Sequence, residues 1–264
     1  MNSDQLIWRQ SVPGEMVSSN EVHVWRANLD FSSLQIENPE GILSADELAR
    51  AGKFHFERDQ MRFIAARGIL RTILGHYLGK KPNKICFEYT SFGKPVLATI
   101  PGNDAISFNV SHSGEIALYA ITSCRKVGID VERIRENVDL WPIANRFFSY
   151  DEISSLERID KKNQCEGFFQ YWVRKEAFIK AMGEGISFPM EQCDVSSIKG
   201  KIWTPIKLSV ENREPSRWYA QDLFPGDGYT AAIAIEGGDL NLSCWHYSLL
   251  AINITSASLN RNDL

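Results

Sequence analysis

Hydrophobic and polar positions along the chain predict an order of elements that occurs twice. Each copy comprises a strand, a long helix and a second strand, at residues 22–26, 57–78 and 116–121 and again at 127–131, 166–182 and 229–235. The second copy follows the first at a distance of roughly 105 to 114 positions, which is typical of an internal repeat. We therefore expect an α+β pseudo-dimer. Its two similar α+β subdomains would each be a small sheet packed on a long helix, with the active site between them.

Signals for helix ends support this repeat. A serine is followed three residues later by glutamate in both copies, at Ser44–Glu47 and at Ser149–Glu152. Such a pair forms a capping box, because each side chain satisfies a free backbone N–H of the first helical turn. Both long helices are followed by a glycine, Gly79 and Gly183, which favours termination.

The repeat also sets the expected domain boundaries. Residues 1–126 are predicted to form the N-terminal subdomain and residues 127–247 the C-terminal subdomain, with the boundary just before the second opening strand. Residues 248–264 are rich in Ser, Asn and Thr, and we expect a loosely held tail.

Composition narrows the class of protein. The chain has 264 residues, of which 44% are hydrophobic and 23% charged, as in ordinary soluble globular proteins. Its net charge of -4 disfavours a nucleic-acid partner. The five cysteines are scattered and never spaced as C-x-x-C, so neither a disulfide framework nor a zinc site is indicated. No apolar run approaches the ~20 residues of a membrane span, and residues 1–10 do not resemble a secretory signal. We expect a cytoplasmic protein without a membrane partner.

Two carboxylates follow a short apolar strand at residues 128–132. Asp130 and Glu132 are two positions apart, so a strand places them on the same face. Like charges this close repel unless a cation or a proton lies between them. Hard oxygen ligands of this kind suit Mg²⁺. The alternative is a strand end with a solvated acidic face.

The second long helix carries charge on an apolar face. Glu176 and Lys180 continue, at helical spacing, the face that begins with Phe169, Trp172 and Val173. Charges on a partly buried face are costly unless they are paired. We therefore favour a functional role for both residues over an ordinary surface salt bridge.

Anion binding has two further sets of candidates. The segment 111–114, Ser-His-Ser-Gly, predicts a tight turn whose N–H groups and imidazole could meet an anion. A serine-hydrolase role is not indicated, because the chain lacks a G-x-S-x-G motif. Cations that could neutralise a phosphorylated ligand are Arg50, Lys53, Arg58, Arg62 and Lys94.

Taken in order, these segments resemble the Sfp-type (surfactin-synthetase-activating type) 4′-phosphopantetheinyl transferase family. The motifs that carry the resemblance are FGKP at 92–95, FNVSHSG at 108–114, GIDVE at 128–132, FFSYDE at 147–152 and WVRKEAFIKAMGEGIS at 172–187. An ordered set of this kind is far more specific than one short motif. The family's fold of two similar α+β halves agrees with the repeat.

The resemblance implies an activity and its partners. A monomeric, Mg²⁺-dependent enzyme would transfer 4′-phosphopantetheine from coenzyme A to a serine hydroxyl of an apo acyl or peptidyl carrier protein, releasing adenosine 3′,5′-bisphosphate. Asp130, Glu132 and Glu176 would coordinate Mg²⁺ with the coenzyme A pyrophosphate. The catalytic residues would be Asp130, Glu176 and Lys180. Glu176 would be the base, directly or through a metal-bound water, and Lys180 would lie on the attacked phosphate. The remaining contacts to coenzyme A would come from Arg50, Lys53, Arg62, Lys94, Pro95, Ser111 and His112.

Glu152 falls on another acidic position of the family's site. Two other functions remain open on the sequence: a non-catalytic module that binds coenzyme A or a nucleotide, and a metal-dependent phosphohydrolase in which water replaces the serine. Retention of Asp130, Glu132, Glu176 and Lys180 argues against the binding module, because binding alone does not require the full set.

Overall fold

The computed structural model describes residues 8–10, 17–30, 41–98, 106–183, 185–198, 202–209, 217–238 and 240–247. The predicted tail at 248–264 lies outside the described residues.

The first half contains a mixed set of strands and helices. They are β1 (Trp8–Arg9), β2 (Glu21–Asn28), α1 (Ala45–Ala51), α2 (Glu57–Leu78), the 3₁₀ helix η2 (Pro82–Lys84), β3 (Phe87–Tyr89), β4 (Pro95–Leu97), β5 (Ile106–Ser113) and β6 (Ile116–Ser123). The predicted strands and the long helix are therefore confirmed in this half, and α2 has the predicted bounds.

The second half repeats this plan with additional short elements. They are β7 (Val127–Arg133), α3 (Leu140–Phe147), α4 (Tyr150–Glu157), η3 (Lys161–Asn163), α5 (Gln164–Met182), η4 (Gly185–Ser187), η5 (Met190–Gln192), β8 (Cys193–Asp194), β9 (Thr204–Pro205), β10 (Lys207–Leu208), β11 (Trp218–Leu223), β12 (Tyr229–Glu236) and β13 (Asn241–His246). Helix α5 begins two residues before the predicted start.

Each half is built on its own sheet. The first sheet has the order β1-β13-β2-β6-β5, and the second has the order β7-β12-β11-β9. Residues 127–247 were expected to form the C-terminal subdomain. Strand β13 (residues 241–246) lies in this range but pairs in parallel with β2 of the first sheet. This pairing covers the edge of β2 that would otherwise leave its backbone groups open.

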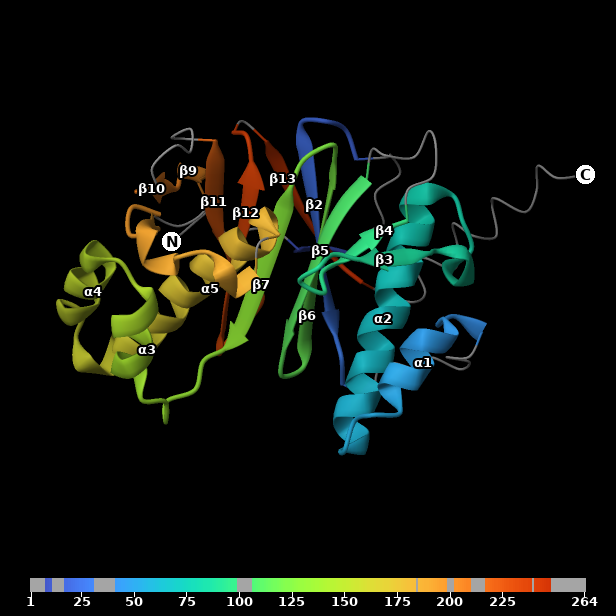
Figure 1. The fold of residues 1–264 in the computed structure, drawn as a ribbon, viewed down its shortest axis with the longest axis horizontal. Coiled ribbons are helices and arrows are strands. Elements are labelled where there is room, and N and C mark those ends of the chain that lie inside the picture. The colour runs from blue at the N-terminus through green and yellow to red at the C-terminus, as the bar shows by residue number, and fades with distance from the viewer. Residues whose placement is uncertain are drawn as a thin grey trace, which may run out of the picture.

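The core is layered, as Figure 1 shows, with α2 against the first sheet and α5 against the second. The faces turned away from these helices pack against each other. Val24 of β2 and Leu118 of β6 meet Ile129 of β7 and Ile233 of β12 in one buried cluster. The predicted α+β pseudo-dimer is confirmed.

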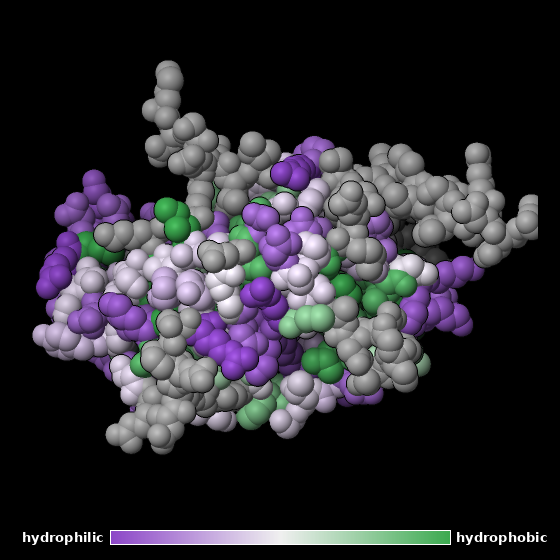
Figure 2. Space-filling model, turned by 90° about the horizontal axis from the view of Figure 1, so that it is seen from above, coloured by the Kyte–Doolittle hydropathy of each residue, from purple (hydrophilic) through white to green (hydrophobic). Residues whose placement is uncertain are grey.

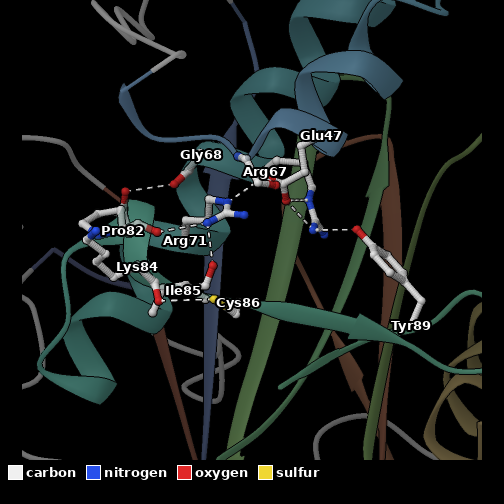
Figure 3. Close-up of polar contacts among 11 residues, drawn as sticks. Glu47, Arg67, Gly68, Arg71, Pro82, Lys84, Ile85, Cys86 and Tyr89 are labelled. Carbon is white, nitrogen blue, oxygen red and sulfur yellow. Dashed lines mark hydrogen bonds and ion pairs between the residues drawn. The ribbon is translucent and has the colours of Figure 1, made fainter. Parts of the chain in front are cut away.

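Both predicted capping boxes form, and in both the glutamate is buried. In the first half, Glu47 lies between two arginines of α2 (Figure 3), with Arg67 Nε and Arg71 Nε each 2.6 Å from its carboxylate. Arg71 also donates to the carbonyl oxygens of Pro82 and Ile85. This cluster fixes α1 to α2 and to the segment that leads into β3.

The second half repeats this arrangement with a different cation. Glu152 Oε2 lies 2.8 Å from Lys175 Nζ of α5, and both side chains are fully buried. Glu152 Oε1 accepts a hydrogen bond from the backbone N–H of Val195 at 2.8 Å. A buried ion pair of this kind is tolerated because its remaining hydrogen-bonding groups are satisfied. Glu152 therefore joins α4 to α5.

Helix α5 crosses β7 very closely at Gly128. A Cβ at this position would overlap the Ala177 carbonyl oxygen and lie 3.0 Å from the Ala181 Cα. Only glycine allows this approach. The close contact brings the last turn of α5 over the face of β7 that carries Asp130.

The surface agrees with the charged composition. On the face shown in Figure 2, hydrophilic residues predominate and hydrophobic residues form separate small areas. Within the part of the chain that the structure describes, no helix has both the length and the apolar character needed to cross a membrane.

Gly128→Ala is expected to lower the free energy of unfolding by about 2–3 kcal/mol, because the added methyl group forces α5 away from β7. Chemical denaturation measures the change. Gly52→Ala is the matched control: Gly52 has φ −65°, and its Cβ would meet nothing closer than 3.7 Å. That control should change stability by no more than about 0.5 kcal/mol. Equal stability of both variants would show that the close crossing is not a constraint.

Candidate functional site

A pocket of about 320 Å³ lies where the two halves meet. The β3–β4 hairpin and β5 form its wall on the side of the first half, and the end of α5 with the residues after it forms the wall on the side of the second. Its lining residues are Phe92, Gly93, Lys94, Pro95, Asn109, Val110, Glu176, Ile179, Lys180, Gly183 and Gly185.

Beside this pocket, β5 and β7 lie next to each other at the centre of the molecule (Figure 1), each at the edge of its own sheet. Their contact uses side chains of β5. Asn109 Oδ1 accepts from the N–H of Ile129 at 2.9 Å, and Ser111 Oγ accepts from the N–H of Val131 at 3.3 Å. Ser113 Oγ continues the series two residues further along β7. We call Asn109, Ser111 and Ser113 the β5 ladder.

The β5 ladder also reaches the carboxylates of β7. Ser111 donates its hydroxyl proton to Asp130 Oδ1 at 2.8 Å, and Ser113 donates to Glu132 Oε2 at 2.8 Å. Asp130 and Glu132 lie on the face of β7 that α5 covers, as the two-residue spacing predicted. Among the described residues, Asp130 Oδ2 is a buried oxygen without a hydrogen-bond partner.

Lys180 reaches the same carboxylate from α5. Its Nζ lies 2.6 Å from Asp130 Oδ1 and 3.0 Å from Ser111 Oγ. The Lys180 side chain is 30% exposed, so it faces the pocket with part of its surface while it pairs with Asp130. The predicted half-buried position of this charge is confirmed.

Burial and, after it, electrostatic repulsion raise the pKa values of two carboxyl groups in the acidic cluster. Burial raises the pKa of Glu176, and the negative charge of Asp130 raises it further, while Lys180 opposes the shift. The pKa of Glu132 is raised by burial and by Asp130, against the hydrogen bond from Ser113. Carboxyl groups that resist ionisation together favour a cation between them.

The acidic cluster has the donor chemistry of a Mg²⁺ site but not its assembled geometry in the described residues. In the described ranges, no group of three or more His, Cys, Asp or Glu side chains is arranged to hold a metal ion. The chemistry of the donors nevertheless fits: Asp130, Glu132 and Glu176 are carboxylates, the ligand type that Mg²⁺ prefers. The unpartnered Asp130 Oδ2 supplies a free ligand atom. Lys180 now lies on the other oxygen of Asp130.

Lys94 makes a contact that the sequence did not suggest. Its ammonium group donates to the carbonyl oxygen of Lys180 at 2.6 Å and to that of Val127 at 3.3 Å. It therefore caps the last turn of α5, where a positive charge is favourable. Burial lowers the pKa of Lys94 to about 8, and the charges of Lys126 and Lys180 act in the same direction.

The other predicted cations lie on the first half. Arg62 of α2 pairs with Glu115 at 3.6 Å. Desolvation lowers the pKa of His112, and the charges of Lys180 and Arg62 lower it further, which favours the neutral imidazole. Arg50 lies in the last turn of α1 and over the ring of Phe63, with its guanidinium 5.5 Å from the ring centroid. Neither Arg50 nor Lys53, which follows α1, lines the pocket.

Comparison with known proteins agrees with this arrangement. Residues 32–124 match the family model for the N-terminal part of 4′-phosphopantetheinyl transferases, and residues 126–234 match the model of the 4′-phosphopantetheinyl transferase superfamily. The 4′-phosphopantetheinyl transferase HetI of Nostoc sp. (strain PCC 7120) is 38% identical over 243 residues, covering 92% of this chain and 99% of that protein. The chain belongs to the 4′-phosphopantetheinyl transferase superfamily.

Other members of the superfamily match over shorter lengths. The 4′-phosphopantetheinyl transferase psf-1 of Bacillus pumilus is 38% identical over 154 residues, which cover 58% of this chain and 64% of the relative. The mouse L-aminoadipate-semialdehyde dehydrogenase-phosphopantetheinyl transferase is 30% identical over 210 residues, covering 75% of this chain and 68% of that protein. The predicted resemblance to the Sfp-type transferases is confirmed.

Within this transferase fold, three of the expected positions differ from the sequence-based interpretation. The segment 111–114 is not a tight turn, because β5 continues through Ser113 and the chain reverses only at Gly114, which has φ 58°. The hydroxyl of Ser111 already donates once and accepts twice, so it has no free capacity for coenzyme A while these contacts persist. Glu152 is buried against Lys175 and not beside the other carboxylates.

The sequence-based interpretation of this transferase missed two residues of the β5 ladder, Asn109 and Ser113. The sequence did contain a signal for them, because residues 109, 111 and 113 are two positions apart and therefore share one face of a strand. That face lies toward the interior, where apolar residues are usual. Three polar side chains there indicate a partner with open backbone groups, which is β7.

Glu176→Gln is expected to raise the unfolding midpoint of the ligand-free transferase at pH 7. Because the folded pKa of Glu176 is raised, the folded state binds more protons than the unfolded state as the pH rises above the unfolded value of 4.5, and stability falls. Glutamine removes this loss. The gain should therefore appear above pH 4.5 and disappear below it.

Denaturant titrations from about pH 4 to about pH 7 measure this dependence. The exposed Glu157, changed to Gln, is the control and should show no comparable gain. A Glu176→Gln variant that is less stable than the unmodified chain at pH 7 would show that burial and the neighbouring charges do not disfavour the ionised Glu176.

Proposed function

We propose that this chain transfers 4′-phosphopantetheine from coenzyme A to a serine hydroxyl of an apo acyl or peptidyl carrier protein. The observation that carries the proposal is the unpartnered Asp130 Oδ2. Its carboxylate is paired through Oδ1 with Lys180, which lines the pocket together with Glu176, and the charges of Asp130 and Glu132 both act on Glu176. An unpaired buried carboxylate oxygen is costly unless a ligand completes its surroundings. Membership of the transferase superfamily supports this assignment of the pocket.

Coenzyme A would lie with its pyrophosphate at the carboxylates. Asp130, Glu132 and Glu176 would hold Mg²⁺, and when bound this cation would neutralise the pyrophosphate and act as a Lewis acid on its oxygens. Pro95 lines the far wall of the pocket, which supports an adenine-side position for the FGKP segment. Lys94 would support that wall through its contacts with α5.

The remaining cations would bind phosphate groups. The lowered pKa of His112 favours the neutral imidazole in the ligand-free protein, which can donate a hydrogen bond to the 3′-phosphate, and the bound phosphate would favour the protonated form. Arg62, Arg50 and Lys53 would add positive charge from α2 and the end of α1. Arginine suits this role because its planar group binds phosphate through two donors.

Transfer itself requires a base and a stabilising cation. The serine Oγ attacks the phosphorus that bears the pantetheine arm, the bond from that phosphorus to the bridging oxygen breaks, and adenosine 3′,5′-bisphosphate leaves with the oxygen. Glu176 would accept the serine proton, and its raised pKa makes it a stronger base than an exposed glutamate. Lys180, which reaches Asp130 from the pocket side, would shift toward the phosphate and stabilise the charge that develops there.

Both halves contribute to the pocket wall, which supports action by one chain as a monomer.

A non-catalytic coenzyme A module is the principal alternative. The direct experiment incubates the protein with coenzyme A, Mg²⁺ and a panel of apo carrier proteins, and follows each carrier by mass spectrometry. Transfer adds one phosphopantetheine to the carrier serine. Tight coenzyme A binding without any modified carrier would favour the binding module, and hydrolysed coenzyme A with unmodified carriers would favour a phosphohydrolase.

Lys180→Met should lower the transfer rate constant at least about a hundredfold, which is the loss expected from removing one electrostatic stabiliser. Lys162→Met is the control, because Lys162 is exposed in η3 at a distance from the pocket. The carrier assay measures both rates. Lys180→Met with near-normal turnover would remove Lys180 from the catalytic residues.

The Mg²⁺ requirement separates Lys180 from Glu176. Glu176→Gln should also lower the rate and should raise the Mg²⁺ concentration needed for half-maximal turnover, because glutamine replaces a charged ligand by a neutral one. Lys180→Met should leave that concentration unchanged. The same carrier assay, run over a range of Mg²⁺ concentrations, measures this difference.

A further inference from the structure

Ser113 makes two hydrogen bonds that tie the β7 backbone and one carboxylate together. Its Oγ donates to Glu132 Oε2 at 2.8 Å and accepts from the N–H of Arg133 at 3.1 Å. We propose that Ser113 is a positioning residue that orients the Glu132 carboxylate for the divalent cation used with coenzyme A. This inference rests on the proposed function and adds to it a residue outside the expected site.

The register of the two strands supports this role. Ser111 and Ser113 are two residues apart on β5, and their carboxylate partners Asp130 and Glu132 are two residues apart on β7. Each serine thus repeats one pattern, with its hydroxyl between a carboxylate and the next backbone N–H of β7. A single contact would say little, but the repeated pattern means that β5 holds both carboxylates of β7 in the same way.

The same contacts hold only one oxygen of each carboxylate. Ser111 donates to Asp130 Oδ1 and Ser113 donates to Glu132 Oε2, so one oxygen of each group is fixed. The other oxygen of Asp130 is buried and without a partner in the described part of the chain. A carboxylate fixed through one oxygen can present the second to a cation without first losing the freedom of its side chain. Partners of this kind commonly change metal affinity by about 10- to 100-fold.

No other described contact fixes Glu132 as firmly. The nearest cation, Arg135, is 4.0 Å from Glu132 Oε2, and its side chain is 63% exposed. An exposed pair at this distance restricts a carboxylate weakly. Ser113 is therefore the main restraint on the orientation of Glu132.

A purely structural role for Ser113 would be to satisfy the N–H of Arg133. Arg133 is exposed, so water can replace the serine oxygen at little cost. On that account Ser113→Ala would leave cation binding unchanged. The two roles are therefore separable by a measurement of cation affinity.

The experiment is calorimetric titration of Mn²⁺ into the protein saturated with coenzyme A. Ser113→Ala should weaken Mn²⁺ binding about tenfold or more, while coenzyme A binding without metal stays unchanged. Ser113→Thr keeps the hydroxyl on a β-branched side chain that strands accept, and it should restore binding to within about twofold of the unmodified chain. The control is Ser107→Ala, because Ser107 lies on the same face of β5, roughly 20 Å before Ser113.

A double-mutant cycle tests whether Ser113 acts through Glu132. In a Glu132→Gln background, Ser113→Ala should cause little further loss of Mn²⁺ affinity, because the group that it orients is already changed. Additive losses, or a Ser113→Ala variant that binds Mn²⁺ like the unmodified chain, would overturn the Ser113 proposal alone. No coenzyme A-dependent Mn²⁺ binding by the unmodified chain would overturn the proposed metal site and this inference with it.

Discussion

The contact between β5 and β7 is the constraint on which the site depends. Two sheets end side by side, and the open N–H edge of β7 is satisfied by Asn109, Ser111 and Ser113. Because side chains make this contact, the two serines also have protons to donate, and they give them to Asp130 and Glu132. One set of hydrogen bonds therefore joins the halves and orients the carboxylates. Any change that separates the strands would also disperse the acidic cluster.

A second constraint places the cationic and acidic residues of α5 above that contact. Gly128 permits the close crossing of α5 over β7, and Lys94 caps the end of α5 from the first half. Behind them, each half uses a buried glutamate of a capping box, Glu47 or Glu152, to fasten its short helix to its long helix. These pairs take no part in the proposed chemistry, but they hold the helices that bear the site.

The sequence predicted the repeated plan and the long helices because periodicity, caps and terminating glycines are local signals. It also predicted that Glu176 and Lys180 occupy a partly buried face, since helical spacing alone determines this. It did not predict that β13 would join the first sheet. Nor did it predict that the Ser111 hydroxyl would make all its hydrogen bonds to Asp130, Val131 and Lys180. Both depend on contacts between residues far apart in the chain. Glu152 illustrates the same limit, because its motif suggests a site whereas its burial with Lys175 indicates a structural pair.

The proposed transfer depends on the carboxylates beside the β5 ladder, which would hold the cation that accompanies coenzyme A. Anomalous diffraction from crystals of the protein with coenzyme A and Mn²⁺ locates that ion directly. We expect one strong peak bounded by Asp130, Glu132 and Glu176, roughly 2 Å from Asp130 Oδ2. Coenzyme A in the pocket with Mn²⁺ bound elsewhere, or with no bound ion at these carboxylates, would contradict the proposed metal site.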